Sequence, residues 1–116
     1  MTLSFMVDER FKRGIHLFNE EEFFECHEVI EDLWLATSDE YKNLYKGVIQ
    51  AAVALYHLGR GNMKGARKLY GTSNKYLRKY LPSALGLNVE KLLADMKICF
   101  EQDNGLIPKL EFKDEQ

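Results

Sequence analysis

Hydrophobic residues recur at helical spacing along most of the chain, and short polar turns separate the segments that carry this pattern. Apolar positions at i, i+3, i+4 and i+7 indicate amphipathic α-helices. The pattern predicts five helices, at about 7–18, 21–36, 39–58, 62–80 and 88–102, and a tail over 104–116 that we expect to pack loosely. The predicted fold class is all-α: a single compact domain over 1–116, a five-helix bundle of antiparallel hairpins with the helices at 21–36 and 39–58 central.

Turn residues support several of these boundaries. Asn62 and Asn88 are placed to act as N-caps of the fourth and fifth helices, and Pro82 ends the fourth. Gly14 lies inside the first helix, where glycine costs about 1 kcal/mol relative to alanine. We therefore expect Gly14 to mark a point where another helix crosses closely.

The stretch from Phe23 to Trp34 has an unusual placement of polar residues. On a helical wheel, His27 and Glu31 fall inside the arc formed by the apolar residues of this helix. Burial of such groups without hydrogen bonds costs several kcal/mol, so each needs a partner, and His27 could bond Glu31 or Gln50. The sequence thus predicts a buried polar cluster that fixes the register of the helices, with candidate members His27, Glu28, Glu31, Gln50 and His57.

Composition is that of an ordinary globular domain and excludes few functions. The 116 residues are 46% hydrophobic and 29% charged, with a net charge of −2. The two cysteines, Cys26 and Cys99, are expected to be free thiols. The sequence shows no signal-peptide pattern and no run of roughly 18 apolar residues, so we expect a cytoplasmic protein without a membrane partner.

One hypothesis is a metal-dependent, hydrolase-like enzyme. His27 and Glu31 are four residues apart on one helix face, and His57 could complete a metal site. However, the HExxE pattern is not the HExxH zinc signature. In an antiparallel hairpin, His57 would also lie roughly 10 Å along the helix axis from His27. The sequence identifies no catalytic residue and favours no cofactor. A divalent metal is the cofactor that this hypothesis would require.

A second hypothesis is nucleic-acid binding through the fourth predicted helix. The segment 62–82 carries no acidic residue, and tyrosines are interleaved with its basic ones, a pattern suited to phosphates and stacked bases. Against this stand the net charge of −2 and the acidic helix at 21–36, which could face the basic stripe within one chain or across a dimer. The candidate residues are Lys64, Arg67, Lys68, Lys75, Arg78 and Lys79.

Several spaced blocks of residues resemble one protein family. The blocks are Gly14 with Leu17-Phe18-Asn19, Phe23-Phe24-Glu25, His27-Glu28 with Glu31 and Trp34, the run 47–52, His57, Gly61-Asn62 and Gly65-Ala66. They resemble the small helical family known as domain of unknown function 309, over roughly residues 11–80. The resemblance implies a compact multi-helix fold and brings no activity, substrate or cofactor with it.

The interpretation we favour from sequence is a non-catalytic interaction or oligomerisation module. The two halves of the chain each hold a helix end, a polar turn and an amphipathic helix, which resembles a tetratricopeptide-like hairpin. Such hairpins bind partners on their helix faces, and small helical domains commonly form homodimers. We expect a protein partner or a homo-oligomer rather than nucleic acid.

Overall fold

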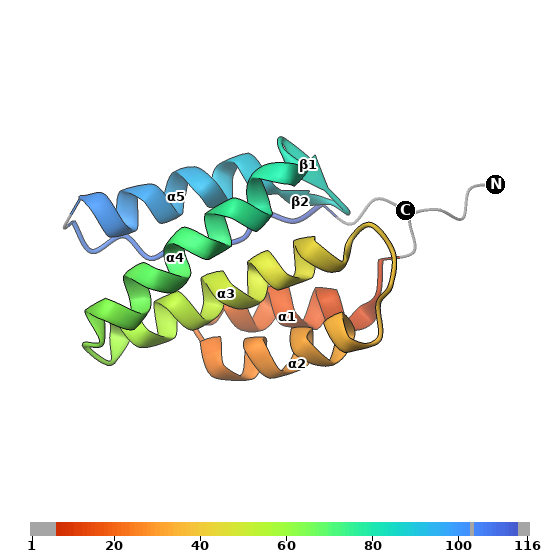
Figure 1. Ribbon diagram of the computed structural model, residues 1–116, viewed down its shortest axis with the longest axis horizontal. Helices are drawn as coiled ribbons and strands as arrows, with labels where there is room; N and C mark the ends of the chain where they lie inside the picture. Colours follow the sequence, from red (N-terminus) through yellow and green to blue (C-terminus); the bar gives the residue numbers. More distant parts are fainter. Residues whose placement is uncertain (1–6, 103, 114–116) are drawn as a thin grey trace.

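The computed structural model describes residues 7–102 and 104–113, and these residues form an all-α bundle (Figure 1). The helices are α1 (Glu9–Asn19), α2 (Phe23–Leu35), α3 (Lys42–Gly59), α4 (Met63–Leu77) and α5 (Val89–Glu101). A short 3-10 helix, η1 (Arg78–Tyr80), extends α4. Two short strands, β1 (Ser83–Ala84) and β2 (Leu87–Asn88), pair antiparallel before α5. The all-α prediction is confirmed.

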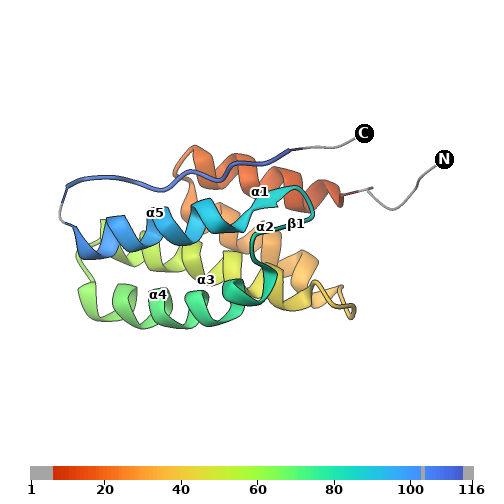
Figure 2. The same cartoon turned by 90° about the horizontal axis from the view of Figure 1, so that it is seen from above.

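Consecutive helices from α1 to α4 pack against one another, so that α3 lies between α2 and α4. Figure 2 shows α5 and the C-terminal segment on the side of the bundle that α1 also covers. The side of α3 turned away from them carries no further helix of the described chain. This open side of α3 is where the candidate site lies.

Glycines bring the helix axes close at two points. A Cβ at Gly14 would overlap the side chain of Ile30 on α2, so the predicted close crossing is confirmed. A Cβ at Gly47 on α3 would lie 2.7 Å from Leu77 of α4. Beside it, the buried Ser73 hydroxyl donates a 2.8 Å hydrogen bond to the Gly47 carbonyl oxygen. These contacts fix α3 against α4 and α2 against α1.

Side-chain caps define the helix starts close to where the sequence placed them. Asn62 Oδ1 accepts a hydrogen bond from the backbone of Gly65, and Asn88 Oδ1 accepts one from Lys91. The third helix begins at Lys42 rather than at 39, because Asp39 accepts a hydrogen bond from the Tyr41 amide and holds a turn there. The observed helix ends differ from the predicted ones by at most three residues.

The expectation of a loosely packed tail is wrong for the described part of it. Pro108 and Leu110 are buried, and the Asn19 side chain both donates to and accepts from the backbone of Leu110, at 3.0 and 2.6 Å. Phe112 forms a bridge with Leu87. Side-chain hydrogen bonds from a distant helix, which composition does not reveal, thus hold this segment in place. Residues 114–116 lie outside the described residues.

Within the described chain, the helices are too short or too polar for any of them to cross a membrane.

Candidate interaction groove

The orientation of α2 differs from the prediction, with consequences for the polar cluster. Its buried residues are Phe23, Cys26, Ile30 and Leu33, whereas Phe24 is 49% exposed. The Glu31 side chain is 48% exposed. The expectation that Glu31 points into the core is therefore wrong. Because α1 packs against α2 from one side and α3 from the other, the buried arc is rotated toward α1 and leaves the Phe24 and Glu31 side at the surface.

The predicted cluster is divided into separate surface contacts. His27 Nε2 lies 3.5 Å from Glu31 Oε1, and His27 Nδ1 lies 3.3 Å from the Phe24 carbonyl oxygen. His57 Nδ1 lies 3.4 Å from Asn62 Nδ2, and Glu28 is exposed. Of the two partners proposed for His27, Glu31 is the one it meets, and no hydrogen bond joins His27 to Gln50. A buried network that fixes helix register is not present among these residues.

The metal-site candidates do not come together either. His27 and Glu31 form a pair on α2, while His57 contacts the turn before α4. Among residues 7–102 and 104–113, no group of three His, Cys, Asp or Glu side chains is arranged to hold a metal ion. The chain thus does not assemble the triad of His27, Glu31 and His57 within its described part.

The open side of α3 carries a polar stripe along an otherwise buried helix. Lys42, Lys46, Gln50, Val53 and His57 are only partly exposed and recur every three or four residues, so they lie on one face. Beside this stripe, an open cleft of about 440 Å³ lies between α3 and α4, and α2 borders the other side. The cleft is lined by Gln50, Thr72, Lys75, Tyr76 and Lys79. We use the name α3 groove for this cleft together with the adjoining α2–α3 surface, which comprises Phe24, Trp34, Lys42, Lys46, Val53 and Tyr56.

Gln50 sits at the centre of the α3 groove with an unsatisfied polar atom. Its side-chain oxygen Oε1 exposes less than 1 Å² and is the buried side-chain acceptor that has no hydrogen-bond partner in the described structure. A buried acceptor left without a donor costs about 1–3 kcal/mol. Gln50 is also one of the residues that line the cleft between α3 and α4.

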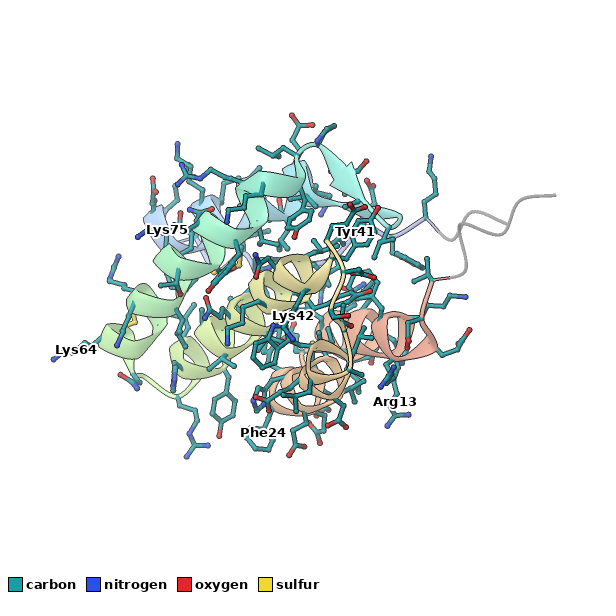
Figure 3. The ribbon with its side chains drawn as sticks, turned by 45° about the vertical axis from the view of Figure 1, so that its right-hand side comes forward. Arg13, Phe24, Tyr41, Lys42, Lys64 and Lys75 are labelled. Atoms are coloured by element: carbon teal, nitrogen blue, oxygen red, sulfur yellow. The ribbon has the colours of Figure 1, made fainter. Side chains whose placement is uncertain are left out.

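Two lysines of α3 gather around Trp34 of α2. The Nζ atoms of Lys42 and Lys46 each lie 4.4 Å from the centroid of the indole ring, within cation–π range. Lys42 also donates hydrogen bonds to the carbonyl oxygens of Trp34 and Thr37. Figure 3 shows Lys42 on the near side of α3, with Lys75 on α4 and Phe24 on α2 to either side of it.

The basic residues of α4 do not form one surface. All six predicted candidates are exposed, but only Lys75 and Lys79 line the cleft. Arg67 borders a separate hollow near Cys99 and Leu106. Figure 3 shows Lys64 pointing away from the bundle at the start of α4. Since α3 separates α4 from α2, the basic and acidic helices do not face each other within the chain.

Sequence reasoning missed the groove because it placed the helix at 39–58 at the centre of the bundle and did not assign it an exposed face. The signal was present in the spacing of Lys42, Lys46 and Gln50, which are four residues apart and interrupt the apolar pattern on one side. Trp34 of α2 borders the same surface. It is half-buried, and its ring faces the lysines of the groove.

The two cysteines are free thiols, as predicted. Cys26 lies on the buried side of α2, and burial raises the pKa of its thiol to about 12. Its neighbour in sequence, His27, contacts Glu31 and Phe24. Cys26 is therefore an inert part of the core.

Comparison with known proteins places the chain in a family. A family described as "Domain of unknown function (DUF309)" matches residues 11–69, which include most of α1, all of α2 and α3 and about half of α4. The uncharacterized protein YpuF of Bacillus subtilis (strain 168) is 38% identical over 84 residues, which cover 70% of this chain and 48% of that protein. An uncharacterized protein of Aquifex aeolicus (strain VF5) is 36% identical over 106 residues, which cover 90% of this chain and 32% of its own length.

The chain thus spans less than half the length of either relative. The matched region contains the α2 and α3 sides of the groove, and the longer match extends over nearly the whole described fold. On the extent of these matches, the chain belongs to the family of domain of unknown function DUF309.

Proposed function

We propose that this chain is a non-catalytic interaction module and that its α3 groove binds a segment of a partner protein. The observation that carries the proposal is the Gln50 side chain, whose buried oxygen lacks a donor at the edge of an open cleft. If the partly exposed Gln50 side chain turns its oxygen toward the cleft, a bound segment can donate a hydrogen bond to it and remove the desolvation cost.

The surroundings of Gln50 suit a protein partner. Phe24 and Tyr56 pack with ring centroids 5.7 Å apart at one side of the groove, and Tyr76 lines the cleft on the other. Large, rigid aromatic side chains dominate the energetics of protein interfaces, because they bury much area and lose little conformational entropy. The groove therefore combines apolar contact area with polar groups that could orient a bound segment.

Site-specific photo-cross-linking tests the proposal. A photoreactive amino acid replaces Val53, which lies on the α3 stripe, or Ala94, which is exposed on α5 and serves as the control. After irradiation in the native cells, we expect a discrete protein adduct from the Val53 position alone. An adduct of twice the chain mass would identify the partner as a second copy, the oligomerisation form of the same module. Equal adducts at both positions, or none, would contradict the proposal.

A further inference from the structure

We infer that the α3 groove binds an acidic segment, one in which glutamate or aspartate side chains stand next to apolar ones. This inference rests on the proposed function and names the chemistry of the partner. It is carried by the charges that the groove leaves uncompensated, by the hydrogen-bonding need of Gln50 and by the exposed aromatic rings.

The four lysines of the groove have no carboxylate partner within the described chain. Elsewhere, Lys91 pairs with Asp95 at 2.7 Å and Arg10 pairs with Asp8 at 3.0 Å. Among the described residues, none of Lys42, Lys46, Lys75 and Lys79 forms an ion pair. The groove is thus locally positive on a chain whose net charge is −2. A partner of opposite charge would be attracted to this surface.

Lys42 and Lys46 also repel each other. Each ammonium nitrogen lies 4.4 Å from the Trp34 ring centroid. The two charges are therefore within roughly 9 Å of each other, which is about one Debye length at physiological salt. The indole ring offsets part of this repulsion through its π face, but it supplies no full negative charge. A carboxylate placed at this end of the groove would interact favourably with both lysines.

Gln50 distinguishes a peptide from a nucleic-acid backbone. Its Oε1 accepts hydrogen bonds and needs a donor. A peptide provides a backbone N–H at nearly every residue, and this donor can be present beside an acidic side chain. A phosphodiester backbone offers only acceptor oxygens to the same atom. The donors of a nucleic acid lie on its bases and, in RNA, on the ribose 2′-OH. Charge alone would suit both polymers, and the donor that every peptide residue carries on its backbone favours the peptide.

The aromatic residues indicate that the segment carries apolar side chains as well. Phe24 is 49% exposed and lies against Tyr56, next to the polar stripe of α3. Leu35, on the same side of α2, is 66% exposed. Apolar side chains of the bound segment would cover these groups while its carboxylates contact the lysines.

Fluorescence anisotropy with a fluorescein-labelled (Glu-Glu-Leu)₄ peptide tests the inference at low ionic strength. The test variants are Lys46→Glu and Lys75→Glu in the groove, and the matched control is Arg78→Glu. Arg78 follows directly after α4, is exposed and does not line the cleft. Its replacement by glutamate changes the net charge of the chain as much as each groove substitution does. Far-ultraviolet circular dichroism verifies that each variant is folded.

We expect each groove variant to weaken peptide binding about tenfold or more and Arg78→Glu to change it less than about twofold. Equal weakening by all three variants would overturn the inference, because binding would then depend on net charge alone. Equally tight binding of a labelled dT₁₂ oligonucleotide, with the same dependence on Lys46 and Lys75, would overturn it in favour of nucleic acid. Absence of peptide binding would also overturn it, whereas a cross-linked partner at Val53 would still support the proposed function.

Discussion

Replacing Gln50 by leucine separates the stability of the fold from its binding function. Glutamine and leucine have similar helix propensities and similar size, so the substitution mainly removes the amide. In the native chain, Oε1 of this amide is buried without a donor. The change should therefore stabilise the free protein and weaken the binding of an acidic peptide.

The magnitude follows from the environment of the side chain. An unsatisfied buried acceptor costs about 1–3 kcal/mol. The residue as a whole is partly exposed, so the lower end of that range applies. We expect Gln50→Leu to raise the free energy of unfolding by about 1 kcal/mol, which corresponds to a rise of about 3–6 °C in Tm for a chain of this size.

Urea unfolding monitored by circular dichroism at 222 nm measures this effect. Asn43→Leu is the matched control, because Asn43 is an exposed amide on the same helix, and its replacement should change stability by less than about 0.5 kcal/mol. In the anisotropy assay, Gln50→Leu should bind the acidic peptide several-fold more weakly. A lower urea midpoint for Gln50→Leu than for the native chain would refute the reasoning, because Oε1 would then contribute to the fold.

Three further predictions concern the scaffold. Gly14→Ala should destabilise the chain by about 1–2 kcal/mol, because overpacking against Ile30 outweighs the gain in helix propensity. Gly71→Ala, which has open space around it, should stabilise the chain by up to about 1 kcal/mol. Urea midpoints measure both changes, and equal stabilisation by the two would contradict the close crossing at Gly14. Asn19→Ala, which removes both hydrogen bonds to Leu110, should speed amide hydrogen exchange in 107–113, while unchanged exchange would show that burial alone holds this segment. Because burial raises the pKa of Cys26 to about 12, its neutral thiol should resist Ellman's reagent at pH 8 in the folded chain and react after denaturation; rapid native labelling at Cys26, located by peptide mass, would disprove its burial.

Much of the scaffold follows from local signals in the sequence. The helix boundaries, the N-caps at Asn62 and Asn88 and the close crossing at Gly14 depend on a few neighbouring residues, and all were predicted. The packed segment around Leu110 was not, because its hydrogen bonds come from Asn19, 91 residues away in the chain. From its composition alone, that segment was predicted to pack loosely.

The amino-acid sequence by itself determined that the chain forms α-helices and, to within three residues, where they begin and end, because helix periodicity and capping act within a few turns. Only the tertiary structure decided which way α2 faces and which polar residues meet. Glu31 shares a helix stripe with apolar residues, yet it lies at the surface because α1 and α3 cover other sides of α2. Likewise, Gln50 and Lys75 lie together because α3 and α4 pack closely at Gly47, a long-range contact that no local pattern specifies.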